Sequence, residues 1–153
     1  FGLDHRQEIA ELVDVANLGL LSFDEARTGI ASALEAAEVW KKYWGLIVCS
    51  SFGKEAAGFT EKADELTTHP NLLVRTRAAE FLGITGDHRA AEVITGCLRK
   101  TADPMEALLM LNTVVFLMDG PMQLTFGITE KDLHPEVRKN EWVKSRMEYI
   151  GIL

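Results

Sequence analysis

The sequence predicts an all-α protein, an α-solenoid in which short antiparallel helical hairpins stack side by side. Three observations lead to this fold class. Apolar residues recur at intervals of three and four along most of the chain, the spacing that places them on one face of a helix. Period-two alternation, which would indicate half-buried strands, is absent from the sequence. Pairs of helical segments also recur with a period of roughly 33 to 35 residues, which is typical of helical repeat proteins.

The size and composition of the chain fit one domain over residues 1–153. Hydrophobic residues make up 47% of the chain and charged residues 25%, a balance typical of globular proteins. The longest apolar run, Val114 to Met118, is far shorter than the ~18 residues of a membrane helix. The chain begins at Phe1 with neither an initiator Met nor a secretory signal. We therefore interpret it as a fragment or a processed chain, and its compartment stays open.

The net charge narrows the classes of partner. A net charge of −7 repels phosphate groups, whereas nucleic-acid binding depends on neutralising phosphates with Lys and Arg. Anionic membrane surfaces are disfavoured for the same reason. We therefore expect neither a nucleic-acid partner nor a membrane partner.

Residues 1–37 are predicted to form a leading helical pair. The first helix carries one apolar face, formed by Ile9, Leu12, Val13 and Ala16. Ser22 precedes the second helix as its N-cap, and Glu25 stands three residues later, the pattern of a capping box.

Residues 38–69 are predicted to form the next helical pair. The segment from Val39 to Phe52 is apolar nearly all round, so we expect neighbouring helices to cover it on more than one side. A second helix is expected from about residue 55 to residue 66. Its buried side chains are predicted to be Ala56, Phe59, Ala63 and Leu66.

Residues 70–102 are predicted to form a third pair with clear boundaries. Asn71 is the expected N-cap of a helix whose apolar stripe stops at Gly83. The Gly86-Asp87 pair predicts a tight turn into a second helix, which carries Cys97 on its apolar face.

Residues 103–153 are predicted to form the terminal repeat. Asp103-Pro104-x-Glu106 combines an N-cap, a proline at the first helical position and an acidic third residue. The helix that follows is the most apolar in the chain and ends at Gly120-Pro121. Residues 121–134 are expected to form a loop with at most one short turn. A closing helix is expected from Pro135, with Val143, Met147 and Ile150 facing inward.

The repeat explains how such apolar helices can exist in water. Aligning the segments places Val39 over Val74 and Ile47 near Leu82, and a glycine turn follows each segment. A single helical hairpin cannot bury both of its apolar faces, so neighbouring hairpins stack and share one core. We therefore expect HEAT-like hairpins, with the helices over 39–52 and 104–118 in the interior of the stack.

Four short motifs inside or beside these helices occur in a fixed order: Lys42-Tyr43-Trp44-Gly45-Leu46, Phe52-Gly53-Lys54-Glu55-Ala56, Val74-Arg75-x-Arg77-Ala78-Ala79-Glu80-Phe81-Leu82-Gly83, and Glu106-Ala107-Leu108-x-x-Leu111-Asn112. Together they resemble the HEAT-like region at the C-terminal end of bacterial sulfatases of the arylsulfatase and heparan-sulfatase type. The closing residues 141–150 also resemble the short helix that often ends such proteins, so the resemblance spans about residues 39–150. Lys42 departs from the family pattern, which usually has Arg there.

The resemblance implies a non-catalytic domain that docks against, or oligomerises, a sulfatase catalytic domain. That catalytic part would hydrolyse sulfate esters or sulfamates of carbohydrates with formylglycine and calcium, and by analogy it would be periplasmic or secreted. The only cysteine-serine string of this chain, Cys49-Ser50-Ser51-Phe52-Gly53, lacks the Pro or Ala and the Arg of the sulfatase nucleophile motif. We therefore predict no catalytic, cofactor-binding or metal-binding residue in this chain.

The remaining titratable residues support the same expectation. The four histidines, His5, His69, His88 and His134, lack metal-ligand spacing. Cys49 and Cys97 lie in apolar helical contexts and are interpreted as free buried thiols, with a disulfide or a reactive thiol as the alternative. Asn112 is isolated on an apolar helix, so we expect it to hydrogen-bond a neighbouring loop.

Trp40, Arg75, Arg77 and Trp142 are the candidate interface residues. Trp40 lies outside the apolar stripe of its helix, and aromatic residues with a polar edge are favoured at interfaces. The arginines belong to a basic group with Arg89, Arg99 and Lys100. This group either binds an anionic sugar or acidic protein surface, or forms salt bridges to Glu80, Asp87 and Glu92.

Two other functions compete with the sulfatase-associated domain. The first is a free-standing HEAT-repeat scaffold that binds another protein, and self-association into a homo-oligomer is open to either protein. The second is a HEAT-type DNA-repair enzyme, which would need a basic groove that a net charge of −7 does not favour.

Overall fold

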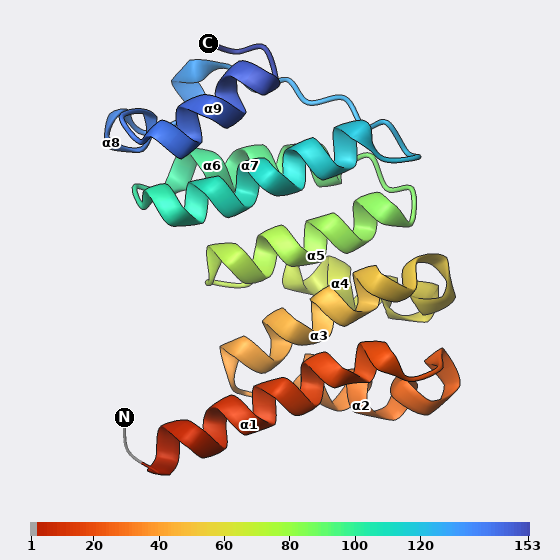
Figure 1. Cartoon of the computed structure of the whole chain (residues 1–153). Coiled ribbons are helices and arrows are strands. Elements are labelled where there is room, and N and C mark those ends of the chain that lie inside the picture. Colours follow the sequence, from red (N-terminus) through yellow and green to blue (C-terminus); the bar gives the residue numbers. More distant parts are fainter. Residues whose placement is uncertain (1–2) are drawn as a thin grey trace.

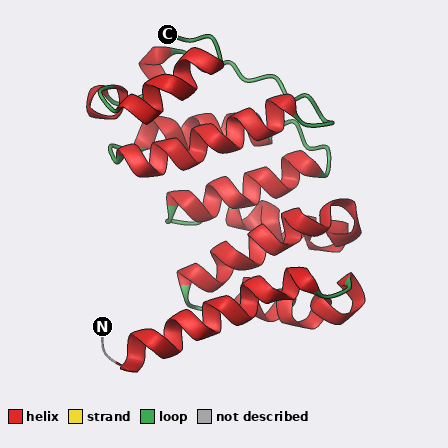
Figure 2. Cartoon of the chain, in the orientation of Figure 1, coloured by secondary structure: helices red, strands yellow, loops and turns green. Residues whose placement is uncertain are grey.

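The computed structural model describes residues 3–153, and every regular element within that range is a helix (Figure 2). This confirms the predicted all-α fold class. The helices are α1 (Leu3–Asn17), α2 (Phe23–Glu35), α3 (Val39–Phe52), α4 (Thr60–Leu66), α5 (Leu72–Ile84), α6 (Ala90–Lys100), α7 (Pro104–Asp119), α8 (Pro135–Arg138) and α9 (Glu141–Tyr149). Three 3-10 segments, η1 (Leu18–Leu20), η2 (Gly53–Phe59) and η3 (Glu130–Asp132), join some of them.

The helices lie in two rows. In Figure 1, α1, α3, α5, α7 and α9 lie one above another with the same chain direction, while α4 and α6 lie behind this front row. Along the front row, α3 packs on α1 and α5, and α7 packs on α5 and α9. The helices α2, α4 and α6 connect successive members of the front row and pack against α3, α5 and α7.

Side-chain caps begin α2, α5 and α7 as the sequence predicted. The Ser22 hydroxyl accepts from Glu25 N, and the Asn71 side chain accepts from the backbone N–H groups of Leu73 and Val74. Asp103 caps α7 in the same way. The prediction of one closing helix is wrong, because the segment is divided in two. The helix α8 ends at Arg138, and Asn140 caps a separate helix, α9. Asparagine at this position satisfies two backbone donors, which favours a new helix start over a continuous helix.

The prediction of one α-helix over residues 55–66 is also wrong in its first part. Residues Gly53–Phe59 wind as a 3-10 helix, and α-helical geometry begins only at Thr60. Gly53 ends α3 with a φ of 62°, a conformation that residues with a Cβ rarely adopt. Gly58, which weakens an α-helix, then lies inside the 3-10 segment.

The buried core runs from α2 to α9, and α5 lies at its centre. The side chains of Val74, Ala78 and Phe81 are fully buried, because α5 packs against α3, α4, α6 and α7. The helices α3 and α7 are less enclosed than the sequence predicted, since each keeps one strip of its surface in contact with water.

The apolar face predicted for the first helix is only partly buried. Leu12 and Ala16 are partly covered, whereas Ile9 and Val13 stay about half exposed. The physical reason is the position of α1 at the end of the front row, where it packs mainly on α3.

Polar contacts between neighbouring helical pairs recur at nearly constant sequence separation. The hydrogen bonds from Arg77 to Tyr43 and from Thr113 to Glu80 join residues 34 and 33 positions apart. The turns between pairs also share one contact, in which a side chain accepts from the backbone N–H two residues later. His69 Nδ1, Thr101 Oγ1 and His134 Nδ1 are the three acceptors.

No helix within residues 3–153 combines the length and the apolar character needed to cross a membrane.

Candidate functional site

A buried polar cluster joins α3, α5 and α7. The Arg77 guanidinium donates to both oxygens of the Glu80 carboxylate, at 3.3 and 3.1 Å, and to the Tyr43 hydroxyl at 3.1 Å. The Thr113 hydroxyl donates to the same carboxylate at 3.2 Å. One chain of hydrogen bonds therefore connects three consecutive helices of the front row.

The charged and polar groups of this cluster stabilise one another. Glu80 is only 8% exposed, and the Arg77 guanidinium lies over the Tyr43 ring at 5.2 Å from its centroid. Burial opposes the charged guanidinium, but Glu80 and the Tyr43 hydroxyl outweigh this effect and raise the pKa of Arg77 above its ordinary value. The Arg77 guanidinium is therefore charged at neutral pH.

Aromatic side chains extend this cluster along α3. The ring of Tyr43 meets Trp40 and Trp44 edge to face, at centroid distances of 5.5 and 5.9 Å. Trp40 is 43% exposed, so part of its side chain meets water beside Tyr43, which accepts a hydrogen bond from Arg77. This position suits a contact with another molecule, because indole combines a large apolar surface with a hydrogen-bond donor.

A small pocket lies farther along the same three helices. Ser50 follows Tyr43, and Ile84 follows Arg77, by two helical turns, so the pocket lies about 10 Å along the helix axes from the cluster. Its cavity volume is about 260 Å³, and its lining residues are Ser50, Lys54, Ile84, Phe116, Leu117, Gly120, Pro121 and Met122. Phe116 at its rim is 53% exposed. We call Trp40, the polar cluster and this pocket the α3–α5–α7 face.

The sequence identified part of this face. Arg77 lies in the polar cluster, and Trp40 lies next to it through their shared neighbour Tyr43. Arg75 instead points to the preceding turn, where its Nε donates to the backbone carbonyl of His69. Trp142 is 69% exposed on α9, away from these contacts. The structure therefore brings together two of the four candidate interface residues.

The predicted role of Asn112 is wrong. Asn112 is exposed on α7, and the next residue, Thr113, makes the buried contact across to α5. Glu80 is one of the salt-bridge partners that the sequence predicted for the basic group, and it pairs with Arg77. Thr113 and Phe116 were not singled out from the sequence. The one available signal was the repeat interval, which the hydrogen bonds now display.

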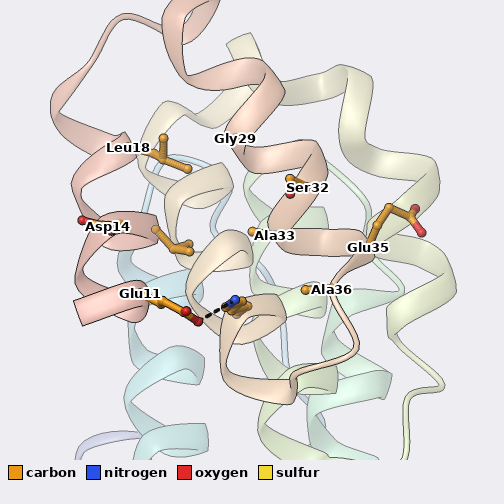
Figure 3. Close-up of a pocket in the computed structure, with 10 residues that line it drawn as sticks. Glu11, Asp14, Leu18, Gly29, Ser32, Ala33, Glu35 and Ala36 are labelled. Atoms are coloured by element: carbon orange, nitrogen blue, oxygen red, sulfur yellow. Dashed lines mark ion pairs between the residues drawn. The ribbon is translucent and has the colours of Figure 1, made fainter. Parts of the chain in front are cut away.

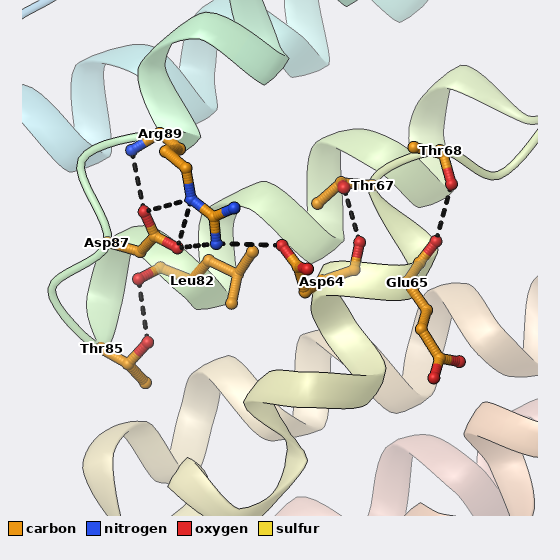
Figure 4. Close-up of polar contacts among 8 residues, drawn as sticks. All are labelled: Asp64, Glu65, Thr67, Thr68, Leu82, Thr85, Asp87 and Arg89. Carbon is orange, nitrogen blue, oxygen red and sulfur yellow. Dashed lines mark hydrogen bonds and ion pairs between the residues drawn. The ribbon is translucent and has the colours of Figure 1, made fainter.

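Three members of the basic group, Arg77, Arg89 and Arg99, form ion pairs. Two of the three predicted partners, Glu80 and Asp87, take part, whereas Glu92 forms no ion pair within residues 3–153. Figure 4 shows Arg89 bridging two carboxylates: it lies 2.7 Å from Asp87 and 3.1 Å from Asp64. The hydrogen bond from Arg89 lowers the pKa of Asp87. Arg99 pairs with Asp132 at 2.6 Å. These contacts tie α6 to its neighbours and reduce the charge free to bind an anion.

A second, wider hollow lies between α1, α2 and α3 (Figure 3). Its volume is about 600 Å³, and an ion pair of 2.9 Å between Lys41 and Glu11 lies at its wall. Hydrogen bonding to Lys41 lowers the pKa of Glu11, and the same contact raises the pKa of Lys41. Both groups are therefore charged at neutral pH, and neither is suited to general acid or base catalysis.

The two cysteines are free and buried, which confirms the predicted thiols. Burial raises the pKa of Cys49 to about 12 and also raises the pKa of Cys97. Both thiols are therefore protonated and unreactive at neutral pH. Among the described residues, no group of three or more His, Cys, Asp or Glu side chains is placed to hold a metal ion.

Comparisons with protein-family models, with curated proteins and with solved structures find no match to this chain.

Proposed function

We propose that this chain is a non-catalytic, HEAT-like α-solenoid module that docks on another protein through the α3–α5–α7 face. The recurring contacts at 33 and 34 residues and the two rows of helices support the solenoid arrangement. In such arrays each repeat contacts only its neighbours, and the exposed sides of successive helices form an extended binding surface.

The observation that carries this proposal is the composition of the face. Trp40 and Phe116 remain partly exposed on either side of a buried arginine–carboxylate pair. Aromatic and arginine side chains around a rigid centre are typical of the residues that dominate binding energy in protein interfaces. Trp40 lies on α3 and Phe116 on α7, with α5 between them, and exposed apolar residues on one face support its role as an interaction surface.

The resemblance over residues 39–150 supplies the proposed partner, a sulfatase catalytic domain. In that assembly the formylglycine and the calcium belong to the catalytic domain, and this chain contributes the docking surface. The codons upstream of Phe1 test the assignment. A sulfatase catalytic region there supports it. An unrelated module there would mean that the same face docks on a different protein.

Binding measurements test the docking face itself. The chain and the sulfatase catalytic domain are mixed, and the dissociation constant is measured by isothermal titration calorimetry. Trp40→Ala and Phe116→Ser should each weaken binding by about tenfold or more, as central aromatic contacts do. Trp142→Ala, which removes an equally large but more exposed ring on α9, is the control and should bind like the wild type.

Two outcomes would contradict the proposal. Equal losses in all three variants would mean that the α3–α5–α7 face has no special role. Turnover of a chromogenic aryl sulfate by the purified chain, surviving repurification, would contradict its non-catalytic character.

A further inference from the structure

The pocket on the α3–α5–α7 face has the size of a side-chain site. Its volume of about 260 Å³ falls below the range typical of pockets for cofactors and drug-sized ligands. Ile84, Leu117 and Met122 supply apolar wall, and Phe116 stands at the rim. One large apolar side chain therefore matches the pocket in both size and polarity.

The wall formed by residues 120–124 is held in place. The Leu124 backbone N–H donates to the Leu117 carbonyl at 3.0 Å, and the Leu124 side chain is buried. Gln123 has a φ of 46°, in the left-handed region that non-glycine residues seldom occupy. The pocket is thus preformed, which reduces the entropy that a bound group must lose.

Two polar groups at the pocket lack partners among the described residues. The Ser50 hydroxyl oxygen is buried without a hydrogen bond, which is an unfavourable state for a polar group. Lys54, one turn farther along the chain, is exposed and makes no ion pair within residues 3–153. In a chain with a net charge of −7, an unpaired ammonium group beside an apolar pocket favours a carboxylate.

We infer that this pocket binds a protein segment that presents one large apolar side chain, Leu or Phe, beside an Asp or Glu carboxylate. The apolar side chain enters between Ile84 and Met122, and the carboxylate pairs with Lys54. This inference rests on the proposed function and names the chemistry of the partner at that face. A polypeptide is the fitting occupant because the partner proposed at this face is a protein, and neighbouring residues of one segment carry an apolar side chain and a carboxylate side by side.

Short peptides test the inference on the whole chain. The backbone amide signals of Ser50, Ile84, Phe116 and Met122 are followed by NMR while Ac-Ala-Glu-Phe-Ala-NH2 is added. The expected dissociation constant is in the millimolar range, about that of a single small anchor. Ac-Ala-Lys-Phe-Ala-NH2 should bind at least about threefold more weakly, and Ac-Ala-Glu-Ala-Ala-NH2 should cause no saturable shift, because each lacks one of the two required groups.

The variant Lys54→Glu should reverse the order of the two phenylalanine peptides. Lys144→Glu makes the same charge change at an exposed residue of α9 and should keep the wild-type order. The inference is overturned if no amide at the pocket shifts, if the acidic and basic peptides bind equally, or if both variants respond alike.

The two proposals can fail separately. If the peptides do not bind but Trp40→Ala and Phe116→Ser still weaken partner binding, the pocket inference falls and the docking function stands. If the acidic peptide binds as expected but those variants leave partner binding unchanged, the docking function falls and the pocket chemistry stands.

Discussion

Arg77 and Glu80 form an ion pair whose stability depends on the packing of the neighbouring helices. Both charges lie largely out of water, with 19% and 11% of their side chains exposed. Removing charges from water is costly, and the cost is offset only when pairing and hydrogen bonds are complete. Tyr43 and Thr113 complete the pairing from the neighbouring helices, so the pair depends on the correct stacking of α3, α5 and α7.

The variant Glu80→Ala should lower the free energy of unfolding by about 3–5 kcal/mol, because it leaves a buried guanidinium without a counter-charge. Urea denaturation measures the change. Asp24→Ala removes one partner of the exposed Asp24–Arg27 pair and should change the free energy by less than about 0.5 kcal/mol. Losses of equal size in both variants would show that the polar cluster contributes no more to the free energy of unfolding than an exposed ion pair does.

His69 gives a second prediction at the residue scale. Burial, together with the charges of Lys42 and Arg75, lowers the pKa of His69 in the folded chain. The unfolded chain takes up this proton near pH 6.5, about the ordinary value, while the folded chain still resists it. The contribution of His69 to the free energy of unfolding is therefore constant above that pH and declines as the pH falls below it, until the folded pKa is reached.

The variant His69→Thr should reduce this pH dependence. Thr101 accepts the equivalent backbone N–H in the next turn, so a threonine can replace the His69 acceptor without a titrating ring. Urea unfolding at pH 7.5 and pH 5.5 compares the two proteins. The wild type should lose more stability on acidification than the variant, and identical losses would contradict the role given to His69.

At the scale of elements, helix ends follow from local residue chemistry. Asn71 accepts two backbone N–H groups at the start of α5, at 2.9 and 3.1 Å. Asn71→Ala should therefore lower the free energy of unfolding by about 0.5–2 kcal/mol, as measured by thermal or urea unfolding. Asn112→Ala, an exposed site within α7, should stay within about 0.5 kcal/mol of the wild type. A greater loss in the second variant than in the first would contradict the capping assignment.

Much of the helical layout could be predicted from the sequence because caps and apolar periodicity are local. The bounds of α3 match the expected segment Val39–Phe52, and Ser22, Asn71 and Asp103 are all helix caps. The 3-10 segment Gly53–Phe59 and the break at Asn140 were missed. The 3-10 segment depends on the backbone conformation of Gly53. The break at Asn140 is hard to predict because Pro135, which starts α8, already accounts for a helix start in this segment.

The candidate site could be predicted only in part, because it joins residues that are distant in the sequence. Arg77, its salt-bridge partner Glu80 and Trp40 stand out in the sequence, but Thr113 acquires a role only when α5 and α7 lie side by side. The pocket depends on residues 120–122 folding back beside Ser50 and Ile84. No local sequence pattern predicts that contact.

At the scale of the whole molecule, the spacing between the helices depends on small residues at close approaches. A Cβ added at Gly83 of α5 would lie 3.0 Å from Leu124 and 3.1 Å from Leu117. A Cβ added at Gly45 of α3 would lie 3.1 Å from the Ala33 side chain of α2. The stack is therefore packed closely enough that added volume must displace neighbouring side chains.

The variant Gly83→Val should lower the free energy of unfolding by about 1–3 kcal/mol, the usual effect of overpacking. Gly96→Ala in α6 is the matched control, since a Cβ there meets nothing within 4 Å. The control should be neutral or more stable by about 0.5–1 kcal/mol, because alanine favours a helix over glycine. Differential scanning calorimetry separates the two, and a stable Gly83→Val protein would contradict the close packing of α5 and α7.

Hydrogen–deuterium exchange of the chain, alone and saturated with the partner proposed above, a sulfatase catalytic domain, tests the docking proposal most directly. The account predicts slower amide exchange on binding in α3 and α7 and at residues 120–122, with little change in α2, α4 and α6. Protection confined to the second row of helices, or to α9 around Trp142, would contradict docking through the α3–α5–α7 face.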